Sequence, residues 1–235
     1  MKLHSCYSLK YGILSPEQLV EWGVGASYSS IFLADINSTG AVLSFVQESQ
    51  KKGIKAVVGV ELRNGMQIKA TLIARNNRGL HEINSFLSGY LHQKKEFPDD
   101  VPHLSNCYVS YPFPGPSRSL NENEYVDIQL TNFNDLNVIN NINKDKVIVL
   151  QAMTFRNKVD HNTHRLLRSI HYNTLLSLLE SNQQASELEL FRSRKELEEK
   201  YSGFLDCLHM TFVLFDSCFV SFDFNEHAIP QNPAT

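Results

Sequence analysis

The sequence predicts an α/β fold, a distorted β/α barrel with a helical C-terminal part. In the first third of the chain, apolar runs typical of buried strands alternate with amphipathic runs typical of helices. This alternation predicts parallel strands covered by helices. Three of the expected strands end in or near an ionisable residue, namely His4, Asp35 and Glu61. Because the carboxyl ends of the strands form the active face of such a barrel, these residues mark the expected site.

Helix and turn signals separate the strands of the first half. Ser15 is a predicted N-cap with Pro16 at the first helical position, and Gly53 is the predicted stop of the second helix. The pair Asn64 and Gly65 predicts a tight hairpin. The expected strands are 1–5, 30–35, 54–62 and 67–74, and the expected helices are 15–27, 38–52 and 77–93.

The second half is less regular and then becomes helical. A loop is expected at 112–124, where the prolines cluster. His161 and His164 lie three residues apart on an expected helix, and without further ligands nearby we interpret them as helix packing or surface residues. The remaining expected strands are 106–113, 125–130 and 146–152, and the remaining expected helices are 134–142, 161–180, 193–202 and 203–220.

Composition places the chain among ordinary globular proteins. It has 235 residues, 42% hydrophobic and 20% charged, which suits one large domain or two small ones. No apolar run approaches the length of a membrane span, and the first residues do not resemble a signal peptide. The four cysteines form no C-x-x-C pair, which favours reduced thiols in a cytoplasmic protein.

The charge balance argues against strong DNA binding by this chain alone. The formal net charge is −3, whereas a protein that grips nucleic acid by itself usually carries a basic face. We therefore expect contact with DNA only indirectly, within a larger assembly.

Four segments in a fixed order carry a family resemblance. They are LHSCYSLKYG, FLADINSTGAVLSF, GIKAVVGVEL and LIARNNRGL, followed later by QAMTFRNKVDHNTHRLL and FVSFDFNEHAIPQNP. Together they resemble the PHP domain at the N-terminus of bacterial DNA polymerase III alpha subunits, over nearly the whole chain. The resemblance implies a seven-stranded distorted β/α barrel. In metal-competent members, it also implies a cluster of divalent ions that activates water and clamps phosphate oxygens.

Most of the metal ligands that the resemblance implies are replaced here. A lysine stands where the first of two paired histidines is expected, a tyrosine where an aspartate is expected, and an isoleucine in place of a third histidine. The final aspartate and histidine of the family pattern become alanine and threonine. These departures are Lys2, Tyr11, Ile36, Ala152 and Thr154.

His4, Asp35 and Glu61 are what remains of the implied metal set. They could hold one weak divalent ion (Mn, Zn or Mg) but not a cluster, so we expect no resident cofactor. In other interpretations, His4 is a polar group satisfied by hydrogen bonds, and Asp35 caps its turn through Asn37 and Ser38. Glu61 ends a buried strand and needs a partner. Our hypothesis is that Lys2 replaces the lost metal charge and pairs with Glu61 or Asp35.

The sequence thus predicts a PHP module of a DNA polymerase III alpha subunit, acting in replication or repair synthesis. We expect it to be vestigial as a phosphoesterase, with no catalytic residue of its own and a structural or interaction role. Residues 1–224 would form the barrel domain, and 225–235 an extended tail leading towards a polymerase core that this chain lacks. The expected partner is the remainder of the alpha subunit. The alternatives are an active metal-dependent phosphoesterase or 3′–5′ exonuclease, and an unrelated β/α enzyme.

Overall fold

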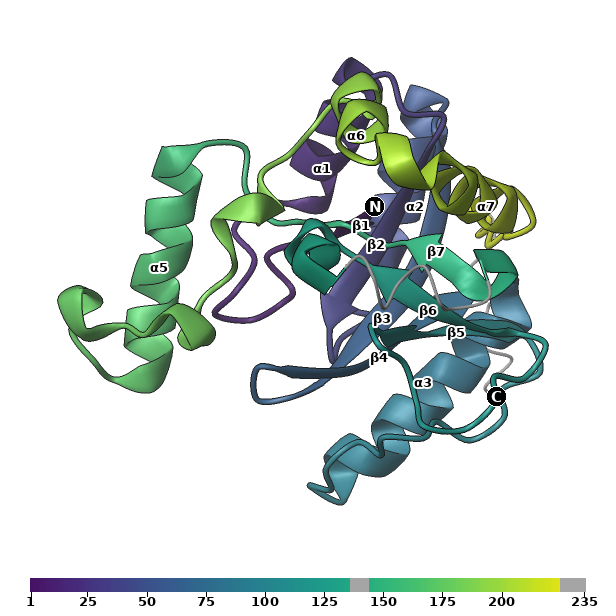
Figure 1. The fold of residues 1–235 in the computed structure, drawn as a ribbon, viewed down its shortest axis with the longest axis horizontal. Coiled ribbons are helices and arrows are strands. Elements are labelled where there is room, and N and C mark those ends of the chain that lie inside the picture. The colour runs from purple at the N-terminus through teal and green to yellow at the C-terminus, as the bar shows by residue number, and fades with distance from the viewer. Residues whose placement is uncertain (136–143, 225–235) are drawn as a thin grey trace, which may run out of the picture.

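Eight strands form one mixed sheet in the computed structural model, which describes residues 1–135 and 144–224 (Figure 1). Along the sheet their order is β7-β6-β5-β4-β3-β2-β1-β8. The predicted α/β class is confirmed. The expected tail 225–235 and all but the first two residues of the expected helix 134–142 lie outside the described residues. The strands are β1 (Lys2–Leu3), β2 (Ser30–Ile36), β3 (Lys55–Asn64), β4 (Gln67–Ala74), β5 (Cys107–Pro112), β6 (Glu124–Ile128), β7 (Val147–Val149) and β8 (Ala152–Met153).

The sheet curls until its two ends are joined by one stretch of chain. β7 pairs in parallel with β6, and β8 pairs in parallel with β1. Only Leu150 and Gln151 separate β7 from β8, and the Lys2 amide donates to the Gln151 carbonyl at 2.9 Å. Counted as one interrupted strand, β7 and β8 reduce the eight strands to the seven of the expected distorted barrel.

One strand runs against the others, as the hairpin signal predicts. β4 is antiparallel to both β3 and β5, whereas the other pairings in the sheet are parallel. The turn between β3 and β4 contains Gly65 at φ 61°, a left-handed conformation that glycine adopts without steric cost. The asparagine and glycine at 64 and 65 therefore set the register of this hairpin.

Helices cover the outside of the sheet, and their ends follow the expected signals. Ser15 caps α1 (Pro16–Gly25) in a capping box with Gln18, and α2 (Val42–Lys52) ends at Gly53, which has φ 68°. The other helices are α3 (Asn77–His92), α5 (Lys158–Tyr172), α6 (Arg194–Lys200) and α7 (Leu205–Asp216). None of the described helices is both long and apolar enough to cross a membrane.

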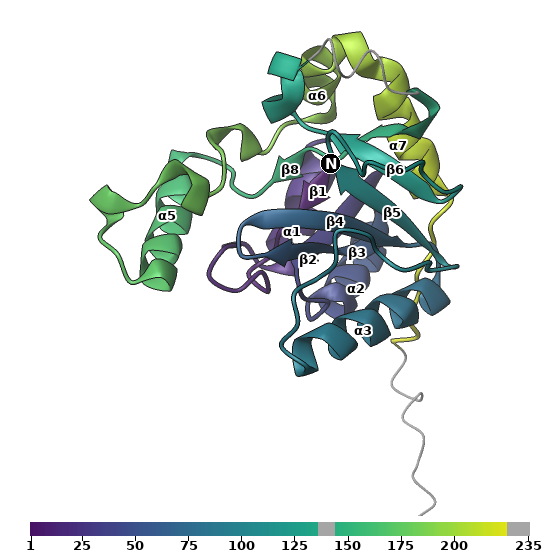
Figure 2. The same ribbon diagram turned by 60° about the horizontal axis from the view of Figure 1, so that its bottom comes forward.

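The segment from 156 to 189 stands apart from the barrel, and we call it the α5 lobe. Both views show α5 to one side of the sheet, joined to it by two connecting segments of the chain (Figures 1 and 2). At this neck, Phe155 and Leu190 form an isolated parallel bridge. The expected helix 161–180 is shorter than predicted, because Asn173 adopts a left-handed conformation at φ 50° and ends α5. Short 3₁₀ helices follow at η3 (Leu176–Leu178), η4 (Ser181–Gln183) and η5 (Glu187–Glu189).

A candidate site at the mouth of the barrel

Polar and charged side chains from β1 and β3, the strands on either side of β2, meet inside the barrel. On β1 and just beyond it, Lys2 and His4 are two residues apart, and Glu61 and Arg63 have the same spacing on β3. Because successive side chains of a strand point to opposite faces, each pair lies on one side of the sheet. All four side chains are buried. Folding therefore places four ionisable groups together in the interior, where each needs a partner.

Glu61 is the centre of this cluster. Lys2 Nζ forms an ion pair with Glu61 Oε2, and Arg63 Nε donates to Oε1 at 2.5 Å. His4 Nε2 lies 3.4 Å from Oε1. Of the two partners expected for Lys2, Glu61 or Asp35, the structure shows Glu61. We call Lys2, His4, Glu61 and Arg63 the mouth cluster.

The charges of the mouth cluster support one another. Burial favours neutral Glu61, but Arg63, Lys2 and His4 outweigh it and hold the Glu61 pKa well below its usual value. Burial likewise disfavours charged Lys2, yet Glu61 and Asp127 together raise the Lys2 pKa. Glu61 is therefore a carboxylate, and Lys2 an ammonium, at neutral pH.

Asp127, on β6, is a further buried carboxyl group near Lys2. It accepts a hydrogen bond from Ser110 Oγ at 3.0 Å, while its Oδ2 has no hydrogen-bond partner among the described residues. Burial raises the Asp127 pKa, and Lys2 opposes that shift. Sequence reasoning missed this residue, although it lies inside an expected strand.

Asp35 is held by hydrogen bonds from the loop at residues 5–12. Three groups donate to its carboxylate at 2.6 Å each: the Ser5 amide, Ser5 Oγ and Ser8 Oγ. Burial, the largest influence, raises the Asp35 pKa in spite of these bonds. Asp35 does organise a turn, but through Ser5 and Ser8 rather than through Asn37 and Ser38 as expected.

The mouth is closed by a residue of the α5 lobe. His4 Nδ1 lies 3.1 Å from Thr154 Oγ1, which donates to Glu189 Oε2 at 2.5 Å. The Tyr11 hydroxyl donates to the same carboxylate at 3.3 Å, and the guanidinium of Arg63 lies over the Tyr11 ring at 4.6 Å. Tyr11 and Thr154, where the family pattern has an aspartate and a histidine, therefore connect the barrel to the lobe.

The residues present do not fit a metal cluster. Glu61 is engaged by two cations, and the Asp35 carboxylate already accepts three hydrogen bonds. Within residues 1–135 and 144–224, no three His, Cys, Asp or Glu side chains are grouped so that they could hold a metal ion. Of the expected ligands, His4 and Glu61 lie together in the structure, whereas Asp35 is hydrogen-bonded to Ser5 and Ser8. A single ion at these three residues stays a prediction.

The family model of the PHP domain matches residues 1–113 of this chain. The matched residues comprise β1 to β5 and contain the mouth cluster. The predicted resemblance is confirmed over this part of the chain.

Curated relatives extend the similarity beyond those residues. A DNA polymerase III subunit alpha from Pasteurella multocida is 21% identical over 280 aligned positions, covering 99% of this chain and 24% of the relative. The Streptococcus pyogenes serotype M1 subunit is 25% identical and covers 78% of this chain and 18% of its own length. This chain thus matches about a quarter or less of those relatives.

Among solved structures, one similar chain is an amidohydrolase from Chromobacterium violaceum with bound sulfate and no metal. It is 11% identical with a TM-score of 0.32, and the alignment covers 73% of this chain and 82% of that one. A similarity at this level bears on neither the site nor the activity.

Proposed function

We propose that this chain is a PHP module that no longer hydrolyses phosphoesters and that serves a DNA polymerase III alpha subunit as a structural and interaction domain. The observation that carries this proposal is the ion pairing of Glu61 with Lys2 and Arg63 inside the barrel. A catalytic metal centre needs ligand atoms free to coordinate and a position open to water. Here protein cations lie against the carboxylate that a metal ion would need.

Closure of the mouth supports the same proposal. His4, Glu61 and Thr154 are fully buried, and Tyr11 is 2% exposed. A phosphoester would have to displace Tyr11 and Glu189 before it reached Glu61. The mouth cluster, through Thr154, Tyr11 and Glu189, therefore helps to attach the α5 lobe to the barrel.

The proposed partner is the remainder of a polymerase alpha subunit, with DNA contacted only through that assembly. The part matched here is 24% of the Pasteurella relative and 18% of the Streptococcus relative, so most of each relative is available to contact such a module. The α5 lobe offers an apolar surface for that purpose, because it exposes Val159, Leu166, Ile170, Leu175 and Leu178. The proposal includes a cytoplasmic location, which agrees with the four unpaired cysteines.

A second candidate function is an active metal-dependent phosphoesterase or 3′–5′ exonuclease. It would place a weakly bound Mn, Zn or Mg ion at His4, Asp35 and Glu61. The contact between His4 and Glu61 favours it. It requires the ion to displace both Lys2 and Arg63 from Glu61, which leaves two buried cations unpaired and is costly.

Metal content decides between the two. The purified protein would be soaked in manganese or zinc, desalted and analysed by mass spectrometry, with Glu61→Gln as the matched variant. We expect well under one ion per chain, unchanged in the variant, and no hydrolysis of a generic phosphodiester or a 3′-labelled oligonucleotide. Two or more ions per chain that are lost in Glu61→Gln, with hydrolysis, would overturn the proposal.

A further inference from the structure

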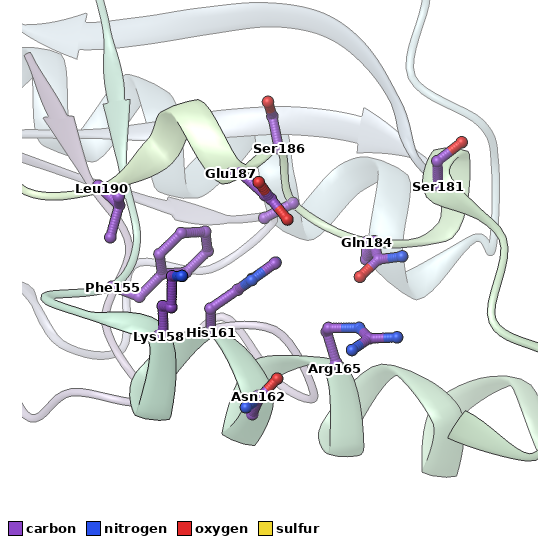
Figure 3. Close-up of a pocket in the computed structure, with 11 residues that line it drawn as sticks. Phe155, Lys158, His161, Asn162, Arg165, Ser181, Gln184, Ser186, Glu187 and Leu190 are labelled. Carbon is purple, nitrogen blue, oxygen red and sulfur yellow. The ribbon is translucent and has the colours of Figure 1, made fainter. Parts of the chain in front are cut away.

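A cavity lies outside the barrel, between α5 and the chain segment 181–190. Its volume is about 780 Å³, within the range of small-molecule sites. Lys158, His161 and Arg165 line one wall at spacings of three and four residues, which places them on one face of α5. Figure 3 shows these side chains directed towards the opposite wall, where Gln184, Ser186 and Glu187 lie.

The basic side chains of this wall form no ion pair within the part of the chain that the structure describes. Among the described residues, neither Lys158 nor Arg165 forms an ion pair, and the one hydrogen bond of the Arg165 side chain is a 3.5 Å contact to the Leu176 carbonyl. Neighbouring arginines of the lobe behave differently. Arg156 pairs with Asp160, and Arg168 donates to the Gln183 carbonyl at 2.8 Å. Among the described residues, Lys158 and Arg165 therefore face a shared cavity without an ion-pair partner.

His161 lines the cavity and carries a buried polar atom. Its Nε2 is shielded from solvent yet has no hydrogen-bond partner among the described residues. Such an atom is costly unless a ligand or water satisfies it. The ring lies 4.6 Å from that of Phe155, and with Leu190 these rings give the cavity an apolar end.

Glu187 helps to define the ligand. Its carboxylate enters the cavity from the wall opposite His161 (Figure 3). It would repel a bare anion, but it would accept hydrogen bonds from hydroxyl or amino groups. The cavity thus combines two cationic side chains, an apolar end formed by aromatic rings, and a carboxylate that can accept hydrogen bonds from a ligand.

We propose that this cavity binds a nucleoside monophosphate. The phosphate would lie against Lys158 and Arg165, where charge-assisted hydrogen bonds are strongest. The planar base would pack at the Phe155 and His161 end, and the sugar hydroxyls would donate to Glu187. This site uses no residue of the mouth cluster, so it does not depend on whether the barrel is vestigial.

The test is calorimetric titration of the whole chain with adenosine 5′-monophosphate, in phosphate-free buffer with a metal chelator. The chelator removes any ion held in the barrel, so the outcome is separate from that of the proposed function. Adenosine and inorganic phosphate are titrated in parallel. We expect the monophosphate to bind at least about tenfold more tightly than either.

Three variants locate the site. Lys158→Gln and Arg165→Gln should each weaken binding by about tenfold or more, because each removes a charged contact to phosphate. Arg78→Gln, an exposed residue of α3, is the matched control and should bind like the unmodified chain. Ring proton shifts of His161 on titration give a second readout. Absence of binding at millimolar monophosphate, equal affinity for inorganic phosphate, or unchanged affinity in both variants would overturn the proposal.

Discussion

His164 makes the attachment of the α5 lobe sensitive to acid. The side chain is fully buried, its Nδ1 donates to the Tyr11 carbonyl at 2.8 Å, and its Nε2 accepts from the Ala185 amide at 2.8 Å. The contact with Ala185 requires the neutral imidazole, because a protonated ring would turn Nε2 into a donor facing another donor, whereas Nδ1 can donate in either form. Burial is the main cause that lowers the His164 pKa to about 4 from an ordinary 6.5.

The sign and size of the effect follow from proton linkage. Since the folded pKa lies below the unfolded one, the stabilisation is complete above pH 6.5 and is lost as the pH falls towards 4. In that window each pH unit removes about 1.4 kcal/mol from the free energy of unfolding. The whole interval amounts to about 3 kcal/mol, and the fall from pH 6.5 to 5 to about 2 kcal/mol.

The perturbation is His164→Asn, compared with the unmodified chain by urea unfolding at pH 7 and pH 5. Trp22, the single tryptophan, packs on Phe191 next to the lobe's neck with ring centroids 4.2 Å apart and reports the transition. At pH 7 the variant should be less stable by about 1–3 kcal/mol, because two hydrogen bonds are lost. At pH 5 that gap should narrow by about 2 kcal/mol.

A matched control and a clear contrary result accompany this prediction. His81→Asn, at an exposed position on α3, should leave the pH dependence of the unmodified chain unchanged. If the gap between His164→Asn and the unmodified chain is the same at both pH values, His164 does not titrate between them, and the reasoning from its burial and hydrogen bonds is wrong.

Three further changes test the barrel. Lys2→Met leaves Glu61 with one cation fewer and should lower the free energy of unfolding, measured in urea, by about 3–5 kcal/mol. The double variant with Glu61→Gln should recover part of that free energy. No recovery would mean that Lys2 and Glu61 do not act as a pair. Ser8→Ala removes one of the three donors to Asp35 and should cost about 1–3 kcal/mol; an unchanged midpoint would show that this hydrogen bond adds nothing. Gly59→Ala would place a Cβ 1.9 Å from a backbone carbonyl of the adjacent strand, so we expect little folded protein by circular dichroism, and a native spectrum and melting temperature would contradict the close approach of these strands.

The sequence predicted the barrel and part of its interior for identifiable reasons. Strand alternation and the helix caps at Ser15 and Gly53 act locally, and the structure has both caps. The pairing of Lys2 with Glu61 could be inferred because a carboxylate ending a buried strand needs a cation. Arg63 carried the same signal, two residues beyond Glu61 on one face of β3, and could have been found by that spacing.

Other features depend on how distant segments return to the barrel. Glu189 reaches the mouth only because the lobe folds back between Phe155 and Leu190, and no local pattern near residue 189 predicts this. The partners of Asp35 are likewise fixed by the path of the loop at 5–12. The helix predicted over 161–180 was too long at its C-terminal end. The apolar periodicity of the sequence continues beyond Asn173, but the backbone turns at that residue and ends α5.

The contact between Glu189 and Thr154 has a consequence for any attempt to build a metal centre at the mouth cluster. Histidines placed at positions 2 and 36 would supply ligands, but the added groups would stand behind a side-chain barrier formed by Tyr11 and Glu189. Access would require the lobe to detach, and His164 and Arg168 also hold that lobe to the loop after β1. An open metal centre and an intact lobe attachment are thus competing demands on the same few side chains, and a gain in one is expected at the expense of the other.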